Sequence, residues 1–318
     1  MVRPPDFPRE PTPARRQPLL GYAMVLTAAT LWAVNGTVSK VILTSADLSS
    51  SRLAEMRSTG AFVGLALTLA LLRRRTLRVS VRELPVLAVF GVLGLALVQV
   101  FYFVAIARLD IGIALLIQYL APLFVALWAR FVLGERVRRR LWLALALALG
   151  GLALIVDVWL GLSLDGTGVL AALGAAAAFA FYILLAEKQV GRRDALSLLL
   201  YGSLFAALFW SAAQPWWTFP SGVVDDSVSL LGNLAGQTLP VWLLVVWMVV
   251  LGTIVPFGLL VAALRHLSAT RAGIAAMWEP VAATLFAYAW LDESLAATQL
   301  AGGAVVLAGI LLAQTARA

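Results

Sequence analysis

The chain has 318 residues, of which 62% are hydrophobic and 13% charged, and its mean hydropathy is +0.94. Soluble globular chains are about 45–50% apolar and about 25% charged, so this composition excludes a soluble fold. The net charge of +8 does not indicate nucleic-acid binding, because the basic residues lie between apolar segments and form no basic face with interleaved aromatic residues. The chain has no cysteine and one histidine, so we expect no metal site and no cofactor.

Residues 1–18 are rich in proline and arginine, which predicts a short disordered tail. The apolar run that follows is too long for a signal peptide, whose apolar region has about 7–15 residues. Ten apolar segments of about 20 residues follow one another from there, each long enough to cross a bilayer. The predicted spans are residues 19–43, 53–72, 84–106, 111–133, 141–160, 167–187, 195–214, 240–264, 272–291 and 296–314. The predicted fold class is therefore an all-α membrane protein with ten transmembrane helices.

The basic residues alternate between loops. Nineteen of the 24 Lys and Arg residues lie on the two tails and on the loops after the second, fourth, sixth and eighth predicted spans, and the other loops carry few. Positive charge marks cytoplasmic loops, so both termini are expected in the cytoplasm of a multi-pass inner (plasma) membrane protein. In the long outer loop from 215 to 240 we expect residues 228–234 to form a short interfacial helix.

The chain also repeats itself internally. Leu109 to Pro122 and Leu267 to Pro280 read as matching segments, and one offset of 158 residues relates them as well as Gly151 to Gly309. A repeat of five spans is odd, so the second copy must enter the membrane upside down. We therefore expect the tail at 1–18, a first five-helix repeat at 19–160 and an inverted second repeat at 167–314.

These features resemble the EamA family of the drug/metabolite transporter superfamily. The resemblance covers about residues 19–314. It depends on the proline within one span of each half (Pro122, Pro280), the acidic residue closing each such span (Glu135, Glu293), a glycine in each final span, and Trp32 with Asn35 in the first span. The resemblance implies a carrier of small metabolites, and leaves the substrate open.

Glu279 is the sharpest candidate for function, because it lies within a predicted span between Trp278 and Pro280. Charged groups within membrane spans are expensive and tend to be functional. A carboxyl here can bind a substrate amine or exchange a proton. The alternative is a structural role, in which the acid fills the backbone gap left by Pro280.

Aromatic and amide side chains on several spans are candidates to line a substrate cavity with Glu279, although each alone is more simply explained by packing between helices. The candidate cavity residues are Trp32, Asn35, Gln99, Tyr102, Gln118, Tyr182, Trp247, Trp278 and Glu279. The candidate gating or hinge residues are Pro122, Pro256 and Pro280.

Other polar residues favour structural interpretations. Glu55 and Arg57 open the second span near the outer surface, where Arg57 either extends to the interface or holds a ligand carboxylate. Glu135 and Glu293 are interpreted as architectural. Gly60 and Gly64 form a motif for close helix packing, by default within the chain, and homodimerisation is left open.

The sequence thus predicts no enzyme but a secondary active or facilitative transporter that exports small metabolites, amino acids first, by alternating access. The expected partners are a small-molecule substrate and the lipid bilayer. Uptake or exchange of sugars, nucleotides or drugs is the main alternative. A membrane enzyme acting on a lipid-linked substrate is a weaker one, because the outer acidic residues are scattered.

Overall fold

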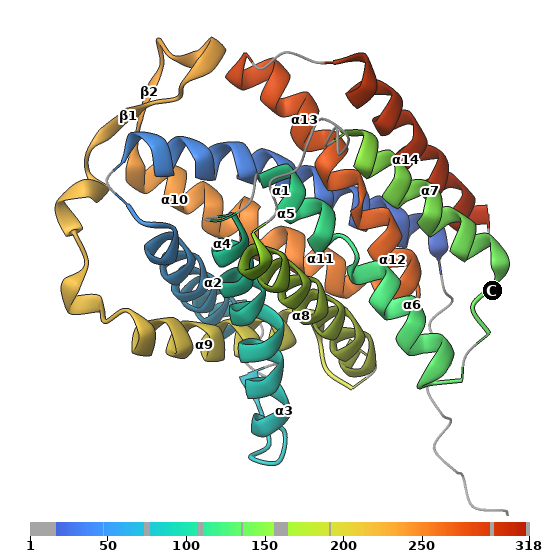
Figure 1. Cartoon of the computed structure of the whole chain (residues 1–318). Coiled ribbons are helices and arrows are strands. Elements are labelled where there is room, and N and C mark those ends of the chain that lie inside the picture. The colour runs from blue at the N-terminus through green and yellow to red at the C-terminus, as the bar shows by residue number, and fades with distance from the viewer. Residues whose placement is uncertain are drawn as a thin grey trace, which may run out of the picture.

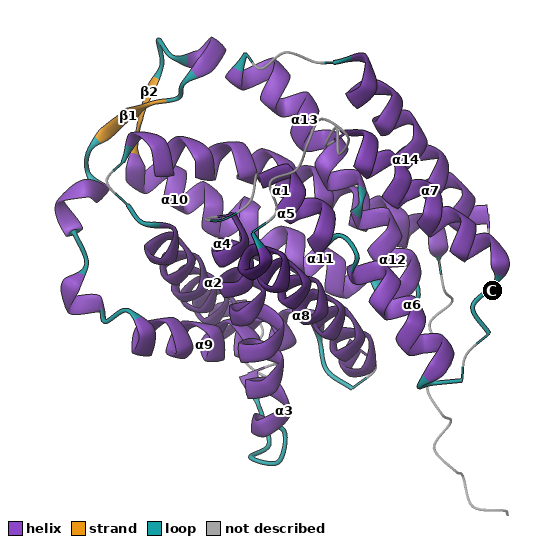
Figure 2. Cartoon of the chain, in the orientation of Figure 1, coloured by secondary structure: helices purple, strands orange, loops and turns teal. Residues whose placement is uncertain are grey.

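The computed structural model describes residues 17–46, 48–72, 77–106, 108, 111–134, 136–155, 165–190, 192–292 and 296–315. This part of the chain is mostly helical, with one short hairpin on the long loop between α9 and α10 (Figures 1 and 2). The helices of the first half are α1 (Pro18–Ser45), α2 (Ser50–Leu72), α3 (Leu84–Val89), α4 (Leu97–Ile106), α5 (Ile111–Gln118), α6 (Ala121–Phe131) and α7 (Arg139–Ile155). Those of the second half are α8 (Gly166–Val190), α9 (Ala195–Ala213), α10 (Val241–Val249), α11 (Val255–Ala263), α12 (Ala269–Ala276), α13 (Trp278–Leu291) and α14 (Ala297–Thr315).

Seven helices in the described ranges are long and apolar enough to cross a membrane. The helix ends lie within a few residues of the predicted span ends. The other three predicted spans contain the shorter helices α5 with α6, α7, and α14. The fourth predicted span is interrupted at Tyr119–Leu120, directly before Pro122. Since proline cannot donate a hydrogen bond within a helix but fits its first turn, a break at this position follows from the sequence.

Two helices widen into π-helical segments at matching places. Phe90–Ala96 joins α3 to α4, and Val250–Ile254 joins α10 to α11. Each segment contains a glycine packed against another helix, Gly94 against Tyr182 and Gly252 against Asn35. Because π-helical turns are rare and concentrate at functional sites, these two segments are natural places for the helices to bend.

Helices of the first half of the chain pack against helices of the second half. α1 packs against α11 and α13, α8 packs against α4 and α5, α2 lies beside α9, and α7 lies beside α14. Figure 1 shows α7 and α14 running side by side at one edge of the molecule. Gly151 and Gly302 let the backbones of α7 and α14 meet, since a Cβ on either would come within 2.6 Å of the other's main-chain oxygen. Gly60 and Gly64 face Val249 and Ile254, so this motif packs inside the protein.

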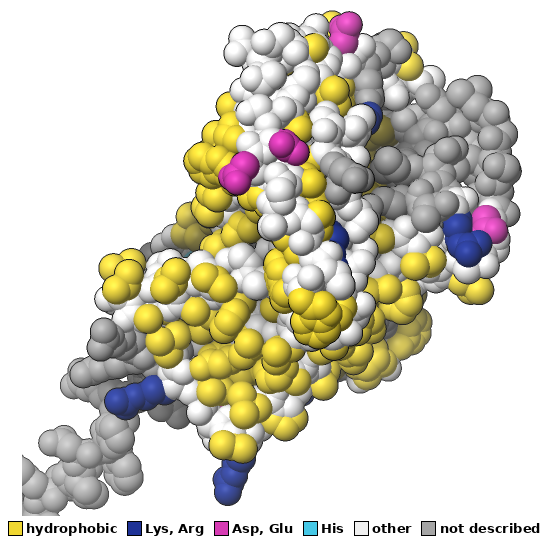
Figure 3. Space-filling view, turned by 90° about the vertical axis from the view of Figure 1, so that its left-hand side faces the viewer, with side chains coloured by type: hydrophobic (Ala, Val, Ile, Leu, Met, Phe, Trp, Pro, Cys, Tyr) yellow, Lys and Arg dark blue, Asp and Glu magenta, His cyan; other side chains and the backbone are white. Residues whose placement is uncertain are grey.

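The outer surface is strongly apolar. Figure 3 shows a broad hydrophobic face with a few charged side chains near its margins. Exposed leucines, valines and tryptophans on many helices contribute to this surface, among them Leu67, Trp128, Leu208 and Leu311. An exposed apolar area of this extent is stable against lipid and not against water. With the seven long apolar helices, it makes this a multi-pass membrane protein.

The long loop between α9 and α10 differs from its prediction. The interfacial helix expected at residues 228–234 is wrong: β1 (Ser227–Ser229) pairs antiparallel with β2 (Thr238–Pro240), and a single 3₁₀ turn covers Gly232–Leu234. The hairpin buries Val228, and the indole of Trp290 donates to the main-chain oxygen of Leu230 at 2.9 Å. Pairing with a second strand and with α13 satisfies backbone groups that a lone interfacial helix would satisfy by itself.

Candidate functional site

An arginine from α2 reaches the π-helical segment of the α10–α11 pair. The Arg57 Nε donates to the Thr253 hydroxyl at 3.3 Å, and this hydroxyl donates to the main-chain oxygen of Met248 at 2.9 Å. The acceptor lies five residues earlier in the chain, where the widened helix leaves a carbonyl within reach of a side chain. Arg57 therefore points to Thr253 instead of extending to a membrane surface as the sequence favoured.

An acid from α13 lies on a second broken span. Glu279 is in the first turn of α13, where the positive end of the helix dipole favours a negative group. The Tyr119 hydroxyl, in the turn between α5 and α6, donates to Glu279 Oε2 at 2.5 Å. The neighbouring Trp278 donates its indole N–H to the Thr30 hydroxyl on α1 at 2.9 Å. The two broken helices and α1 thus hold the acid in one orientation.

The Arg57 guanidinium and the Glu279 carboxyl lie close enough to interact electrostatically with each other and with the Tyr102 hydroxyl of α4. Within the described part of the chain, neither Arg57 nor Glu279 forms an ion pair within 4 Å; each is held by a neutral hydroxyl instead. Both side chains, and Tyr102, are surrounded by protein but keep some surface within reach of solvent. We call Arg57, Tyr102, Tyr119, Thr253 and Glu279 the central cluster.

The candidate cavity residues from the sequence fall into three groups. Tyr102, Gln99, Gln118, Trp278 and Glu279 are half-buried, Trp32, Asn35 and Tyr182 are buried, and Trp247 is exposed on α10. Five of them carry a buried polar atom without a protein partner, and protein interiors normally satisfy such atoms with protein or ordered water. These atoms are Trp32 Nε1, Asn35 Oδ1, Gln99 Oε1, Gln118 Oε1 and the Tyr182 hydroxyl.

The buried aromatic residues form a wall. Phe257 of α11 contacts Trp32 of α1 edge-on at 4.9 Å between ring centroids and Tyr182 of α8 at 5.6 Å, and Tyr182 also stacks on Phe90 at 5.0 Å. Aromatic pairs at these separations contribute about 0.5–1.5 kcal/mol beyond area burial. The wall therefore ties the first helix of each half to the π-helical spans.

The predicted hinge prolines follow the helix interruptions. Pro122 lies in the first turn of α6 and Pro256 in the first turn of α11, directly after the π-helical segment. Pro280 lies in the first turn of α13, after the turn at Met277. Glu135 and Glu293 lie outside the described residues.

Three contributors to the site were missed from the sequence, and a fourth, Arg57, was placed near the outer surface with a ligand carboxylate as its alternative partner. Thr30, Tyr119 and Thr253 are ordinary residues within apolar runs. Tyr119 follows Gln118 in the turn before Pro122, and Thr253 follows Gly252, so polar residues beside these breaks were the available signal.

A sequence profile described as the EamA-like transporter family matches residues 19–157 and again residues 166–315. The chain belongs to the EamA-like transporter family. An uncharacterized transporter of Archaeoglobus fulgidus is 30% identical over 232 residues, 73% of this chain and 76% of that protein. This EamA-like chain is also 27% identical to the threonine/homoserine exporter RhtA of Escherichia coli K12 over 253 residues, 78% of this chain and 77% of that one.

Two further comparisons concern a shorter part of the chain and the fold. The pseudopaline exporter CntI of Pseudomonas aeruginosa PAO1 is 34% identical over 132 residues, 41% of this chain and 44% of that protein. A solved crystal structure superposes with a TM-score of 0.74 at 19% identity, covering 92% of this chain and 96% of its own. That likeness supports the fold alone.

Proposed function

We propose that this protein exports small metabolites, amino acids first, as a secondary active or facilitative transporter. The observation that carries the proposal is the central cluster, in which Arg57 and Glu279 present opposite charges without pairing to each other. An amino acid carries a carboxylate and an ammonium group, which are the partners that such charges prefer. RhtA and CntI, whose names describe export of an amino acid and of pseudopaline, support an exporter.

The proposed topology has ten spans in the inner membrane with both termini in the cytoplasm. The alternation of basic loops supports it, and helix occupies each of the predicted spans within the described ranges. Attaching a membrane-impermeant thiol reagent to single cysteines, one at exposed Arg82 and one at exposed Trp217, tests the orientation, because the chain has no cysteine of its own. The two positions should react from opposite faces.

We also propose that residues 19–160 and 167–314 are inverted repeats. Reciprocal contacts support the proposal: Gly151 meets Gly302, and their counterparts at the offset of 158, Gly309 and Ala144, meet in turn. Exchanging the two halves therefore turns one contact into the other, which is the signature of a two-fold axis.

Two more reciprocal pairs support the same axis. Gly94 packs on Tyr182 and its counterpart Gly252 packs on Asn35, which joins the third helix of each half to the first helix of the other. Gly91 packs on Gly202, while Val249, at the same offset of 158, packs on Gly60. Such a swapped arrangement gives two equivalent packings, one open to each side.

Alternating access would then use bending at the helix interruptions. Pro122, Pro256 and Pro280 follow the breaks that position Tyr119, Thr253 and Glu279. A bend at a break moves the site residue next to it, so opening of a face and release of ligand are coupled.

The proposal is tested by substrate counterflow in proteoliposomes with a panel of labelled amino acids, with and without a pH gradient. We expect exchange of one amino-acid class that is lost in Glu279→Gln and in Arg57→Gln. Asp225→Asn and Arg82→Gln, both exposed outside the helices, are the matched controls and should exchange like the wild type.

Exchange that survives both central substitutions would place the substrate elsewhere and overturn the role of the central cluster. Exchange of no amino acid would overturn the substrate class, and sugars, nucleotides and drugs would be tested next. Exchange lost in Glu279→Gln and unaffected by pH in the wild type would make the acid a ligand for the amine and exclude proton coupling.

A further inference from the structure

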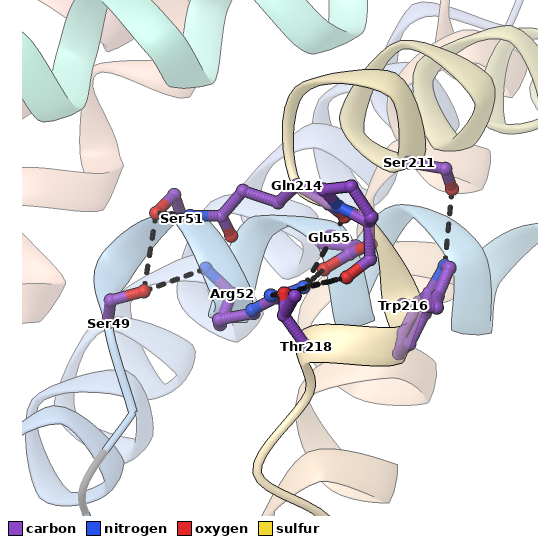
Figure 4. Close-up of polar contacts among 9 residues, drawn as sticks. Ser49, Ser51, Arg52, Glu55, Ser211, Gln214, Trp216 and Thr218 are labelled. Carbon is purple, nitrogen blue, oxygen red and sulfur yellow. Dashed lines mark hydrogen bonds and ion pairs between the residues drawn. The ribbon is translucent and has the colours of Figure 1, made fainter.

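A second arginine of α2 forms a buried junction with the far end of α9. The Arg52 Nη1 donates to Glu55 Oε2 at 2.6 Å and to the main-chain oxygens of Gln214 and Pro215 at 3.3 Å each, and its Nη2 donates to the Thr218 hydroxyl. Figure 4 shows these groups converging on the guanidinium, with Gln214 also bonded to Ser51. We call Arg52, Glu55, Gln214, Pro215 and Thr218 the Arg52 clamp.

The other end of the same helix pair carries a similar junction. The Arg193 Nη1 donates to the Ser197 hydroxyl at 2.7 Å, and its Nη2 donates to Glu83 Oε2 at 2.6 Å. Both nitrogens also approach the main-chain oxygen of Arg78 at 3.4 Å. We call Arg78, Glu83, Arg193 and Ser197 the Arg193 clamp.

The two clamps occupy equivalent positions in the two halves. Gly60 of α2 and Gly202 of α9, which are counterparts in the reciprocal contacts, differ by 142 residues. Arg52 and Arg193 differ by 141, and their partners one helical turn onward, Glu55 and Ser197, differ by 142.

Each clamp crosses from one half of the chain to the other. Arg52 lies in the first turn of α2 and Arg193 lies two residues before α9. Each donates to main-chain oxygens in the segment that follows the second long helix of the other half. Since α2 and α9 pack side by side, the clamps fasten opposite ends of one antiparallel pair.

The chemistry of the clamps suits a latch. A guanidinium with several acceptors in fixed positions forms directional, charge-assisted bonds, and a buried charge must keep its partners. Arg52 is 9% exposed and Glu55 is fully buried, with Oε1 of Glu55 left without a protein partner. Opening α2 away from α9 at this end breaks at least three bonds together, and α2 also carries Arg57 of the central cluster.

We propose that the Arg52 and Arg193 clamps are the two gates of this transporter, each released when its own face opens. Arg52 and Arg193 are thus positioning residues that set which face reaches the central cluster. The proposal rests on the proposed alternating access, but it is measured without any substrate, so failure of the amino-acid proposal leaves the test intact.

The test uses the cysteine-free background. A single Gln118→Cys beside the central cluster is labelled by a membrane-impermeant maleimide from each face in turn, in right-side-out and inside-out vesicles. We expect Arg52→Ala to shift the ratio of labelling rates between the two faces by about tenfold, because losing one charge-assisted network is enough to move a two-state equilibrium by that much. We expect Arg193→Ala to shift the ratio in the opposite direction.

The controls are exposed arginines outside the two clamps. Arg82→Ala and Arg108→Ala should leave the ratio unchanged, because the side chain of Arg82 is exposed and that of Arg108 makes only an exposed ion pair at 3.8 Å to Asp165. Thr218→Val and Ser197→Ala each remove one acceptor and should give smaller shifts in the same directions as the alanine variants. They remain informative if an arginine variant does not fold.

Shifts of the same sign in both arginine variants would indicate general loosening and overturn the proposal. An unchanged ratio in both the alanine and the single-acceptor variants would overturn it as well. A shift at one clamp alone would overturn the equivalence of the two gates. Opposite shifts support the proposal whichever face is cytoplasmic.

Discussion

Arg52 and Arg57 lie five residues apart on α2 and are held in opposite ways. Arg52 is bonded to a carboxylate at 2.6 Å and to three further oxygens. Among the residues that the structure describes, Arg57 has one bond, at 3.3 Å, to a neutral hydroxyl, and its nearby acid Glu279 is bonded to a tyrosine. Both terminal nitrogens of Arg52 donate to oxygens of the protein, whereas those of Arg57 are left to donate to another partner. A saturated charge holds helices together, and an unsaturated one can bind a ligand.

The largest effect is expected from a substitution that breaks the Arg52–Glu55 ion pair. Glu55→Ala should lower the free energy of unfolding by about 3–5 kcal/mol, because it leaves the Arg52 charge buried without its carboxylate. Glu279→Gln, which replaces an acid held by a single tyrosine bond, should cost less. Thermal unfolding in detergent compares the two, and an equal loss in both would remove the distinction between them.

The second prediction adds volume beside the central cluster. Gly252→Ala should destabilise the protein by about 1–3 kcal/mol, since overpacking forces shifts in a filled interior and the new methyl would overlap the Asn35 side chain. Gly36→Ala is the matched control, because nothing lies within 4 Å of its Cβ position. It should stabilise α1 by up to about 1 kcal/mol through helix propensity. Similar melting temperatures for the two variants would contradict the packing at Gly252.

A smaller change tests how the acid is oriented. Tyr119→Phe removes the donor to Glu279 and should slow counterflow about tenfold, the equivalent of one hydrogen bond to a charged group. Tyr22→Phe removes a buried hydroxyl that has no protein partner and should leave exchange unchanged. Wild-type exchange in Tyr119→Phe would show that Glu279 needs no positioning by this tyrosine.

The smallest effect concerns pH at the Arg193 clamp. The main-chain N–H of Ser80 and the guanidinium of Arg193 hold the pKa of Glu83 below its ordinary value of 4.5. The bond to Arg193 is therefore complete above that value and weakens as pH falls through the lowered pKa. Under acid, the ratio of Gln118→Cys labelling rates between the two faces should shift toward the Arg193 face in the wild type, and this ratio cancels the slower reaction of a protonated thiol with maleimide.

The matched variant for this pH effect is Glu83→Gln. It lacks the titrating group at the clamp, so its ratio of labelling rates should already favour the Arg193 face at neutral pH and should not change with acid over the same range. An acid response of equal size in both proteins would assign the effect to another group.

Some of these features follow from the chain alone. Apolar length, the prolines and Glu279 within an apolar run depend on local sequence, so helix positions and breaks could be predicted to within a few residues. The hairpin at Ser227–Pro240 could not, because its strands are three residues each and are defined by pairing with each other and with Trp290.

The sequence by itself determined the class of the protein. A chain that is 62% hydrophobic cannot keep all of its apolar surface away from water by folding alone, so part of that surface must contact lipid. It also indicated Glu279 and the matching breaks in the two halves. Only the tertiary structure decided which polar residues meet. Arg52 and Arg57 look alike in sequence, and their difference comes from their contacts with the second half of the chain, where the segment after α9 supplies three oxygens to Arg52 and the α10–α11 pair supplies one hydroxyl to Arg57. Those contacts join residues more than 150 positions apart, at distances that no local pattern encodes.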